Sequence, residues 1–229
     1  MLTFEGLQKT IGIRFRDQKL LKEAFIHRSY LNESKQTKES NERLEFLGDS
    51  VLSFLTSHFL YEKYPNYPEG ILTNIRSSLV KTKSLSDAAK SIGLGDLLYL
   101  SRGEEDSGGR SNASLLADVF EALLGAIYLD QGTNKAQQFL QTCLFPKAKD
   151  IVDQKAYIDY KSHLQEIVQE KVRISPLYRV VKSEGPDHNK IFWVEAVVDN
   201  EVIGRGSGKS KQEAEQAAAL AALERKYKS

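Results

Sequence analysis

The chain has 229 residues, of which 41% are hydrophobic, and its 32 basic and 31 acidic side chains leave a formal net charge of +1. This composition supports a sizeable core in one or two domains and excludes a polycation that binds polyanions through bulk charge. The N-terminus, MLTFEGLQKTIGIRFRDQ, lacks an apolar targeting segment, and no apolar run reaches the roughly 20 residues of a membrane span. The single cysteine, Cys143, is expected to be a small core residue and fits a reducing compartment, so we predict a cytoplasmic protein without a membrane partner.

The first two-thirds of the chain carries helical patterns, because four segments repeat apolar residues at intervals of three and four. These segments are RDQKLLKEAFIHRSY (16–30), RLEFLGDSVLSFLTSHFLYEKY (43–64), LTNIRSSLVKTKSLSDAAKSIG (72–93) and ASLLADVFEALLGAIYLDQG (113–132). Pro65 and Pro68 mark a break between two of them, and SRGEEDSGGRSN (101–112) has the composition of a polar loop. The pattern predicts an all-α N-terminal part.

Further along the chain the period changes. Two helices are predicted, YKSHLQEIVQEKV (160–172) and KQEAEQAAALAALERK (211–226), and the segments between them, PLYRVVKSE, IFWVEAVVD and EVIGRGS, are rich in the β-branched and aromatic residues of strands. Alternation along the middle strand turns Phe192 toward the helices and Trp193 away from them. The predicted organisation is an all-α domain over 1–150, a linker over 151–157 and a small α+β domain, of order α-β-β-β-α, over 158–227.

Acidic residues occur in unusual places on two of the predicted helices. The stretch NERLEFLGDSVL carries Glu42, Glu45 and Asp49 opposite its leucine stripe, which alone would be an ordinary solvated face. The second helix, LLADVFEALLGAIYL, is apolar or small on every side except at Asp118 and Glu121, and a helix that is apolar all round is buried. An ionised carboxylate in such a place must be protonated, paired with a cation or bound to a metal ion.

The spacing of these acids favours a shared metal site. Asp118 and Glu121 share one helix face, as do Glu45 and Asp49, and no lysine, arginine or histidine occurs between positions 111 and 134. Carboxylate oxygens without thiol or imidazole favour Mg²⁺ or Mn²⁺ over zinc. A di-iron site would need a histidine three residues after an acid, which neither helix has. The four histidines are scattered along the chain, and their spacing indicates structural or surface positions.

The stretch NERLEFLGDSVL (41–52) resembles the signature of the ribonuclease III family. EAFIHRSYLNE (23–33), PEGILTNIRSSLV (68–80) and LLADVFEALLGAIYLDQG (115–132) resemble the other nuclease-domain blocks of that family in order and spacing. The resemblance implies a homodimeric, all-helical endonuclease domain that cleaves double-stranded RNA with Mg²⁺, which Mn²⁺ can replace. It also implies 5′-phosphate and 3′-hydroxyl ends with a short 3′ overhang, and a role in processing rRNA precursors and some mRNAs and tRNAs.

The same resemblance suggests roles for individual acids. The direct metal ligands are expected to be Glu45, Asp118 and Glu121, with Glu121 also acting in catalysis. Asp49 is expected to bind the metal ion through water or to orient the nucleophile in an in-line attack by a metal-activated water. Further acids near the dimer interface and the path of the substrate match Glu42 and Glu69.

The C-terminal part is similar to a double-stranded RNA-binding domain. Such domains contact two minor grooves of the A-form duplex and the phosphates between them. Gln165 lies where the first helix of the family meets one minor groove, and GPDHNKIF, which contains His188, resembles the loop that enters the next. Lys209 and Lys211 lie at a helix N-terminus, where phosphate binds well. Many members carry further basic residues here, whereas this chain has Gln212 and Glu213, which predicts weaker binding.

Two alternative interpretations stay open at this point. One is a double-stranded RNA-binding factor that keeps the fold without cleaving, and the complete set of acids counts against it. The other is a metal-dependent phosphohydrolase for nucleotides, which would not require the second domain. A cleavage assay with and without Mg²⁺ distinguishes these interpretations from the endoribonuclease.

Overall fold

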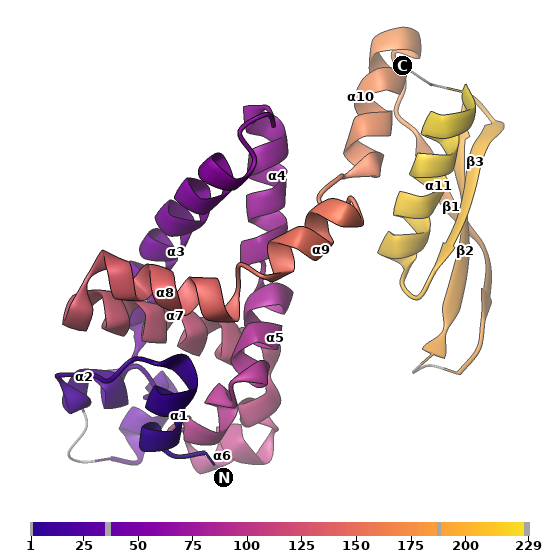
Figure 1. Cartoon of the computed structure of the whole chain (residues 1–229). Helices are drawn as coiled ribbons and strands as arrows, with labels where there is room; N and C mark the ends of the chain where they lie inside the picture. The colour runs from indigo at the N-terminus through magenta and orange to yellow at the C-terminus, as the bar shows by residue number, and fades with distance from the viewer. Residues whose placement is uncertain (1, 35–37, 187–188, 227–229) are drawn as a thin grey trace. The chain divides into compact units, whose positions relative to one another are not determined.

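The structure is a computed structural model that describes residues 2–34, 38–186 and 189–226. The chain divides into two compact units, Met1–Tyr157 and Ile158–Ser229 (Figure 1). Each unit has its own hydrophobic core. In the described part of the chain, none of the helices has the length and apolar character needed to cross a membrane.

The first unit is built from helices, as the periodicity predicts. They are α1 (Phe4–Ile11), α2 (Gln18–Glu23), α3 (Glu42–Lys63), α4 (Glu69–Val80), α5 (Thr82–Ser91), α6 (Arg102–Asp106), α7 (Ala113–Gln131), α8 (Thr133–Cys143) and α9 (Lys147–Asp153), with short 3-10 turns η1 (Arg28–Asn32), η2 (Leu94–Leu97) and η3 (Gly109–Ser111). The long apolar helix α7 is buried along most of its length and supplies the centre of this core. Cys143 packs against the same core, where burial raises the pKa of its thiol to about 11.

Three segments differ from the sequence prediction. The helix expected over 16–30 ends at Glu23, because Ile26 forms a parallel bridge with Tyr99 and its backbone leaves the helical path. The helix expected over 72–93 is two helices, since Lys81 adopts an extended conformation between them. The polar loop expected over 101–112 contains α6 and η3.

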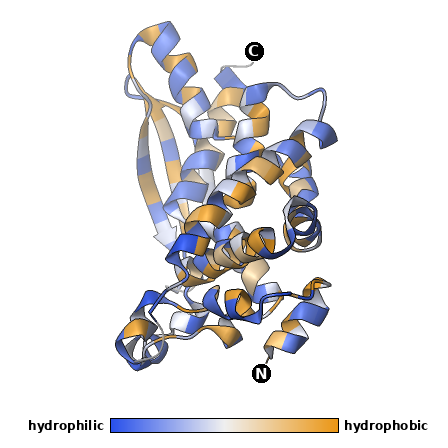
Figure 2. Ribbon diagram, turned by 90° about the vertical axis from the view of Figure 1, so that its left-hand side faces the viewer, coloured by the Kyte–Doolittle hydropathy of each residue, from blue (hydrophilic) through white to orange (hydrophobic). Residues whose placement is uncertain are grey.

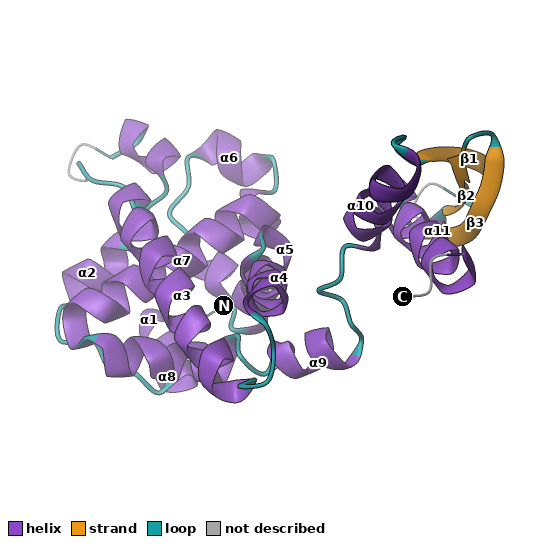
Figure 3. Cartoon of the chain, turned by 90° about the horizontal axis from the view of Figure 1, so that it is seen from above, coloured by secondary structure: helices purple, strands orange, loops and turns teal. Residues whose placement is uncertain are grey.

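The second unit is a three-stranded antiparallel sheet with two helices. Its strands β1 (Leu177–Glu184), β2 (Ile191–Val198) and β3 (Glu201–Gly208) lie in that order, and α10 (Tyr160–Val172) and α11 (Lys211–Lys226) cover one face of the sheet (Figure 3). Both hydrophobic and hydrophilic residues occur along the strands (Figure 2), and the buried apolar ones, Val194, Ala196 and Val198 of β2 and Ile203 of β3, belong to the core of this unit. The fold class is therefore as predicted: an all-α unit followed by a small α-β-β-β-α unit.

Candidate metal centre and nucleic-acid interface

Three carboxylates from two helices meet on the surface of the first unit. Glu45 of α3 and Asp118 and Glu121 of α7 each offer an oxygen atom, and these atoms lie within 4.8 Å of one another. Each of the three side chains is partly buried. We call this group the carboxylate cluster. Its oxygen donors, without thiol or imidazole, fit a hard divalent cation such as Mg²⁺ or Mn²⁺.

Two glycines explain why the acids of α3 and α7 come so close together. A Cβ atom built on Gly48 would lie 1.9 Å from the carbonyl oxygen of Glu121, and one built on Gly125 would lie 2.3 Å from the carbonyl oxygen of Leu44. No side chain fits at either distance, so the two backbones touch directly. Because the helices are in contact here, Glu45 of α3 lies close to Asp118 and Glu121 of α7.

The cluster holds negative charge in a poorly solvated place. The pKa of Glu121 is raised to about 8, first by burial and then by the charges of Asp49, Glu45 and Asp118. Burial also raises the pKa of Glu45 and of Asp118, and Asp118 is the main charge that adds to the effect on Glu45. A divalent cation would relieve both the repulsion and the loss of solvation.

Asp49 is exposed and lies outside the group of three. It is near enough for its charge to act on both Glu45 and Glu121. This position suits a residue that acts through water instead of binding the ion directly.

Two basic residues near the cluster, His27 and Arg28, were not expected from the sequence. Burial raises the pKa of Asp118 and of Glu45, whereas the charge of Arg28 lowers both, and a proton on His27 would act on Asp118 in the same direction. Their segment is joined to the start of α3 by Asn41, whose backbone N–H donates to the Ile26 carbonyl at 2.8 Å. The absence of basic residues near α7 in sequence therefore did not predict the absence of cations near it in space.

The two outer acids behave differently from the cluster. Glu42 is exposed in the first turn of α3, where it accepts a 2.7 Å hydrogen bond from the Ser40 hydroxyl and raises the pKa of Glu45 through its charge. Glu69 is exposed at the start of α4 and accepts a hydrogen bond from Thr73. The structure does not bring Glu69 into the carboxylate cluster.

In the second unit the side chains expected to contact RNA are exposed. Gln165 lies on the outer side of α10, and Lys209 and Lys211 lie just before and at the first residue of α11. His188 lies outside the described residues, so its contribution stays a prediction. Because Lys209 and Lys211 are exposed and take no part in the core of this unit, their side chains are available to bind a ligand.

The start of α11 is closed by Glu213. The Ser210 hydroxyl accepts a hydrogen bond from the Glu213 N–H at 3.1 Å, and the Glu213 carboxylate accepts one from the Lys209 N–H at 2.9 Å. This pair resembles a capping box, except that the carboxylate bonds the N–H of the residue before the N-cap Ser210. A carboxylate therefore lies at the end of the helix where phosphate would bind, which gives the weaker binding expected for this sequence a physical cause.

The open face of the sheet carries charge and one aromatic ring. Glu195 lies between Arg179 and Arg205 of the neighbouring strands and bonds both at 2.9 Å. The Lys182 ammonium group lies 5.0 Å from the centre of the Trp193 ring. Trp193 thus faces away from the helices, as alternation predicts, and is partly covered by a lysine.

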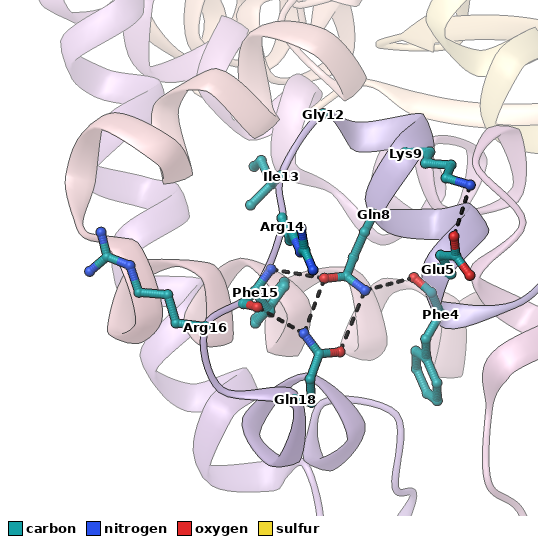
Figure 4. A pocket seen from close by; sticks show the side chains of 10 residues that line it. All are labelled: Phe4, Glu5, Gln8, Lys9, Gly12, Ile13, Arg14, Phe15, Arg16 and Gln18. Atoms are coloured by element: carbon teal, nitrogen blue, oxygen red, sulfur yellow. Dashed lines mark hydrogen bonds and ion pairs between the residues drawn. The ribbon is translucent and has the colours of Figure 1, made fainter.

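A pocket lies elsewhere in the first unit (Figure 4). This pocket of about 740 Å³ lies beside α1, where the Gln8 carboxamide accepts a 2.8 Å hydrogen bond from the Phe15 N–H and Gln18 donates to the Phe15 carbonyl. None of the acids of the cluster lines it. A long duplex is better received by an exposed face than by such a pocket, so we place the chemistry at the cluster.

The fold, the carboxylate cluster and the second unit together define an endoribonuclease. Residues 17–148 match the family model described as ribonuclease-III-like, and residues 160–226 match the double-stranded RNA binding motif. The chain belongs to the ribonuclease III family. It is 48% identical to Ribonuclease 3 of Enterococcus faecalis over 221 residues, covering 95% of this chain and 94% of that one. It is 44% identical to Ribonuclease 3 of Listeria monocytogenes over 227 residues, covering 97% of each.

Solved structures agree with this assignment for the first unit. The nuclease domain of ribonuclease III from Campylobacter jejuni superposes with a TM-score of 0.57 at 38% identity, covering 62% of this chain and 92% of that one. A second structure of that domain, described as showing structural flexibility in a region involved in dimer formation, gives a TM-score of 0.58 at 37% identity, covering 63% of this chain and 99% of that one.

Proposed function

We propose that this endoribonuclease cleaves double-stranded RNA with Mg²⁺, or Mn²⁺ in its place, to give 5′-phosphate and 3′-hydroxyl ends with a short 3′ overhang. The observation that carries the proposal is the carboxylate cluster, in which three acids from α3 and α7 lie within 4.8 Å without thiol or imidazole donors. Natural substrates would be structured transcripts, such as precursors of rRNA and some mRNAs and tRNAs, in the cytoplasm.

The residues of the site divide the work between binding and positioning. Glu45, Asp118 and Glu121 hold the ion, and Glu121 must lose its proton to do so. When bound, Mg²⁺ supplies positive charge that stabilises the phosphate as it is attacked and acidifies water. Asp49 orients the attacking water in line with the leaving oxygen. Glu42 lies beside this group, at the edge of the path taken by the RNA.

The second unit retains the duplex. Gln165 exchanges hydrogen bonds with 2′-hydroxyls in a minor groove, and Lys209 and Lys211 contact phosphates. We assign residues 1–150 to catalysis and dimerisation and 158–227 to RNA binding, with His188 entering the second minor groove and Glu69 facing the substrate path. The linker expected over 151–157 includes the end of α9 and belongs to the first compact unit.

A homodimer is supported by an apolar face on α3. Phe46, Phe54 and Tyr61 are 78%, 63% and 74% exposed, and their spacing places them within one sector of the helix surface. Large apolar side chains gathered on one exposed face mark an interaction surface. A second copy of the chain is the natural occupant because Phe46 directly follows the ligand Glu45, so self-association would set two cleavage sites near one duplex.

The test is cleavage of a long perfect RNA duplex with and without Mg²⁺. The wild-type chain should give staggered fragments with 5′-phosphate ends, while Glu121→Gln should lower the rate by at least about a thousandfold, since one ligand charge is lost. Duplex binding should change little. Glu5→Gln, which neutralises an exposed acid on α1, is the matched control and should cleave normally. Near wild-type cleavage by Glu121→Gln would refute the assignment.

A further inference from the structure

Under the proposed function the carboxylate cluster must bind the phosphate backbone of RNA, although the metal-binding form of the cluster is itself negatively charged. Glu45, Asp118 and Glu121 lie together, with the charge of Asp49 close by. A single divalent cation leaves such a group with net negative charge, and the phosphodiester adds another. A positive group on the protein is therefore needed to bring the phosphate against the ion.

Arg28 is placed to supply that charge. Its guanidinium lies 3.8 Å from Glu42, one turn before Glu45 on α3, and its charge acts on both Glu45 and Asp118. The separation from Glu42 is longer than a hydrogen bond, and the Arg28 side chain is 72% exposed. Such a loose surface ion pair contributes little to stability, so the guanidinium can exchange Glu42 for a phosphate at small cost.

Hydrogen bonds fix the backbone on the N-terminal side of Arg28. Buried Asn41 donates from its N–H to the Ile26 carbonyl at 2.8 Å and from its side chain to the Ala24 carbonyl at 3.2 Å. His27 donates from its N–H to the Tyr99 carbonyl at 3.1 Å. Arg28 thus starts from a fixed point next to the first turn of α3.

The other side of Arg28 is fixed as well. The His27 ring accepts a hydrogen bond from the Ser29 N–H, and the Ser29 hydroxyl accepts one from the Ser101 N–H at 2.9 Å. His27 is therefore a cap of η1 whose ring is committed locally, whereas Arg28 projects outward. A fixed backbone that carries a loosely paired, exposed guanidinium is suited to bind phosphate in a defined orientation.

We propose that Arg28 leaves Glu42 when the duplex binds and contacts the phosphate group that is cleaved, holding it against the metal ion of the carboxylate cluster. Arg28 is then a substrate-contacting residue of the reaction, and Glu42 is its resting partner in the free protein. This inference rests on the proposed function, because it assigns a residue to that same cleavage site.

The experiment compares Arg28→Gln, Arg28→Lys and Arg28→Ala with the wild type in single-turnover cleavage of one RNA duplex. Arg28→Gln should cleave about ten- to a hundredfold more slowly, because one preorganised charge on the phosphate is lost. Arg28→Lys should be less impaired. Low concentrations of guanidinium, well below those that unfold proteins, should restore part of the activity of Arg28→Ala. Arg43→Gln, which removes an exposed charge from the next position after Glu42, is the control and should cleave normally.

A second measurement separates a phosphate contact from a structural role. In metal-free buffer, Arg28→Gln should lower the slope of log Kd against log salt concentration by about one phosphate contact. Slower cleavage with an unchanged slope and no rescue by guanidinium would overturn the contact, and so would wild-type rates in Arg28→Gln. Failure of the wild-type chain to cleave would instead overturn the proposed function, and this inference with it.

Discussion

Glu121 is a carboxyl group in a largely buried position, where its charged form is poorly solvated. It lies on a largely apolar helix, and burial together with the charges of three acids, Asp49, Glu45 and Asp118, raises its pKa to about 8. Without a cation the folded chain therefore retains a proton on Glu121 at neutral pH. Burial of this acid costs stability in the cation-free chain, and under the proposed function a divalent cation would recover it.

The first residue-scale prediction concerns pH. A carboxyl with a pKa of about 8 in the folded chain, against 4.5 as its ordinary value, binds more protons when folded. The stability of the metal-free protein should therefore fall as pH rises from about 4.5 toward about 8. Thermal midpoints of the wild type and Glu121→Gln, measured in chelator across this interval, should diverge with the wild type falling faster. Parallel curves would show that Glu121 is not perturbed by folding.

Repeating these thermal measurements with added Mg²⁺ provides the control. A cation that binds only the folded chain raises its stability, so added Mg²⁺ should recover the wild-type midpoint at the upper end of the interval. Glu121→Gln should gain much less. An equal gain in both proteins would place the ion at a different set of ligands.

At the scale of elements, the contact between α3 and α7 brings the carboxylate cluster together. Gly48→Ala should force the two backbones apart, since its Cβ would lie 1.9 Å from the carbonyl oxygen of Glu121. We expect a loss of unfolding free energy of about 1–3 kcal/mol or more, measured by urea denaturation, together with weaker metal binding. Gly103→Ala in α6, where a Cβ would meet nothing within 4 Å, should leave both unchanged. Equal stability of Gly48→Ala and wild type would contradict the close contact.

The exposed face of α3 gives a second prediction at this scale. Phe46→Asp places a charge in the apolar face, and burying that charge on association would be costly. Sedimentation equilibrium should therefore give the monomer mass, 25.8 kDa, at concentrations where the wild type gives twice this value. Leu129→Asp, at an apolar position of α7 that is 55% exposed, is the control and should remain dimeric. A dimeric Phe46→Asp would exclude this face as the interface.

At the scale of the whole molecule, the part predictable from sequence is set by local periodicity. The change from a helical repeat of apolar residues to segments rich in β-branched residues predicts the two units, and the acids within apolar α7 predict the carboxylate cluster. Both patterns lie within single helices or strands. Features that depend on contacts between distant segments cannot be predicted in this way. The approach of Arg28 to Asp118 arises from hydrogen bonds of Asn41, and Lys81 breaks a continuous helical pattern without a proline or glycine to announce it. By contrast, the spacing of Ser210 and Glu213 is a local signal that indicates an N-terminal cap of α11 as well as missing basic charge.

The division of labour between the units gives the last prediction. Lys209 and Lys211 are exposed at the start of α11, where phosphate contacts carry no base identity. Replacing both by alanine should weaken binding to unrelated RNA duplexes by a similar factor and reduce the salt slope by up to about two phosphate contacts, fewer if the carboxylate of Glu213 already keeps phosphate away. Gln165→Ala should instead lower the preference for RNA over DNA duplex, since DNA lacks the 2′-hydroxyl. Titrations of both variants with an RNA duplex, its DNA counterpart and a scrambled RNA measure these effects separately. A lysine variant that lost affinity for one sequence only would show that this unit recognises bases, and the assignment of backbone recognition to α11 would then be wrong.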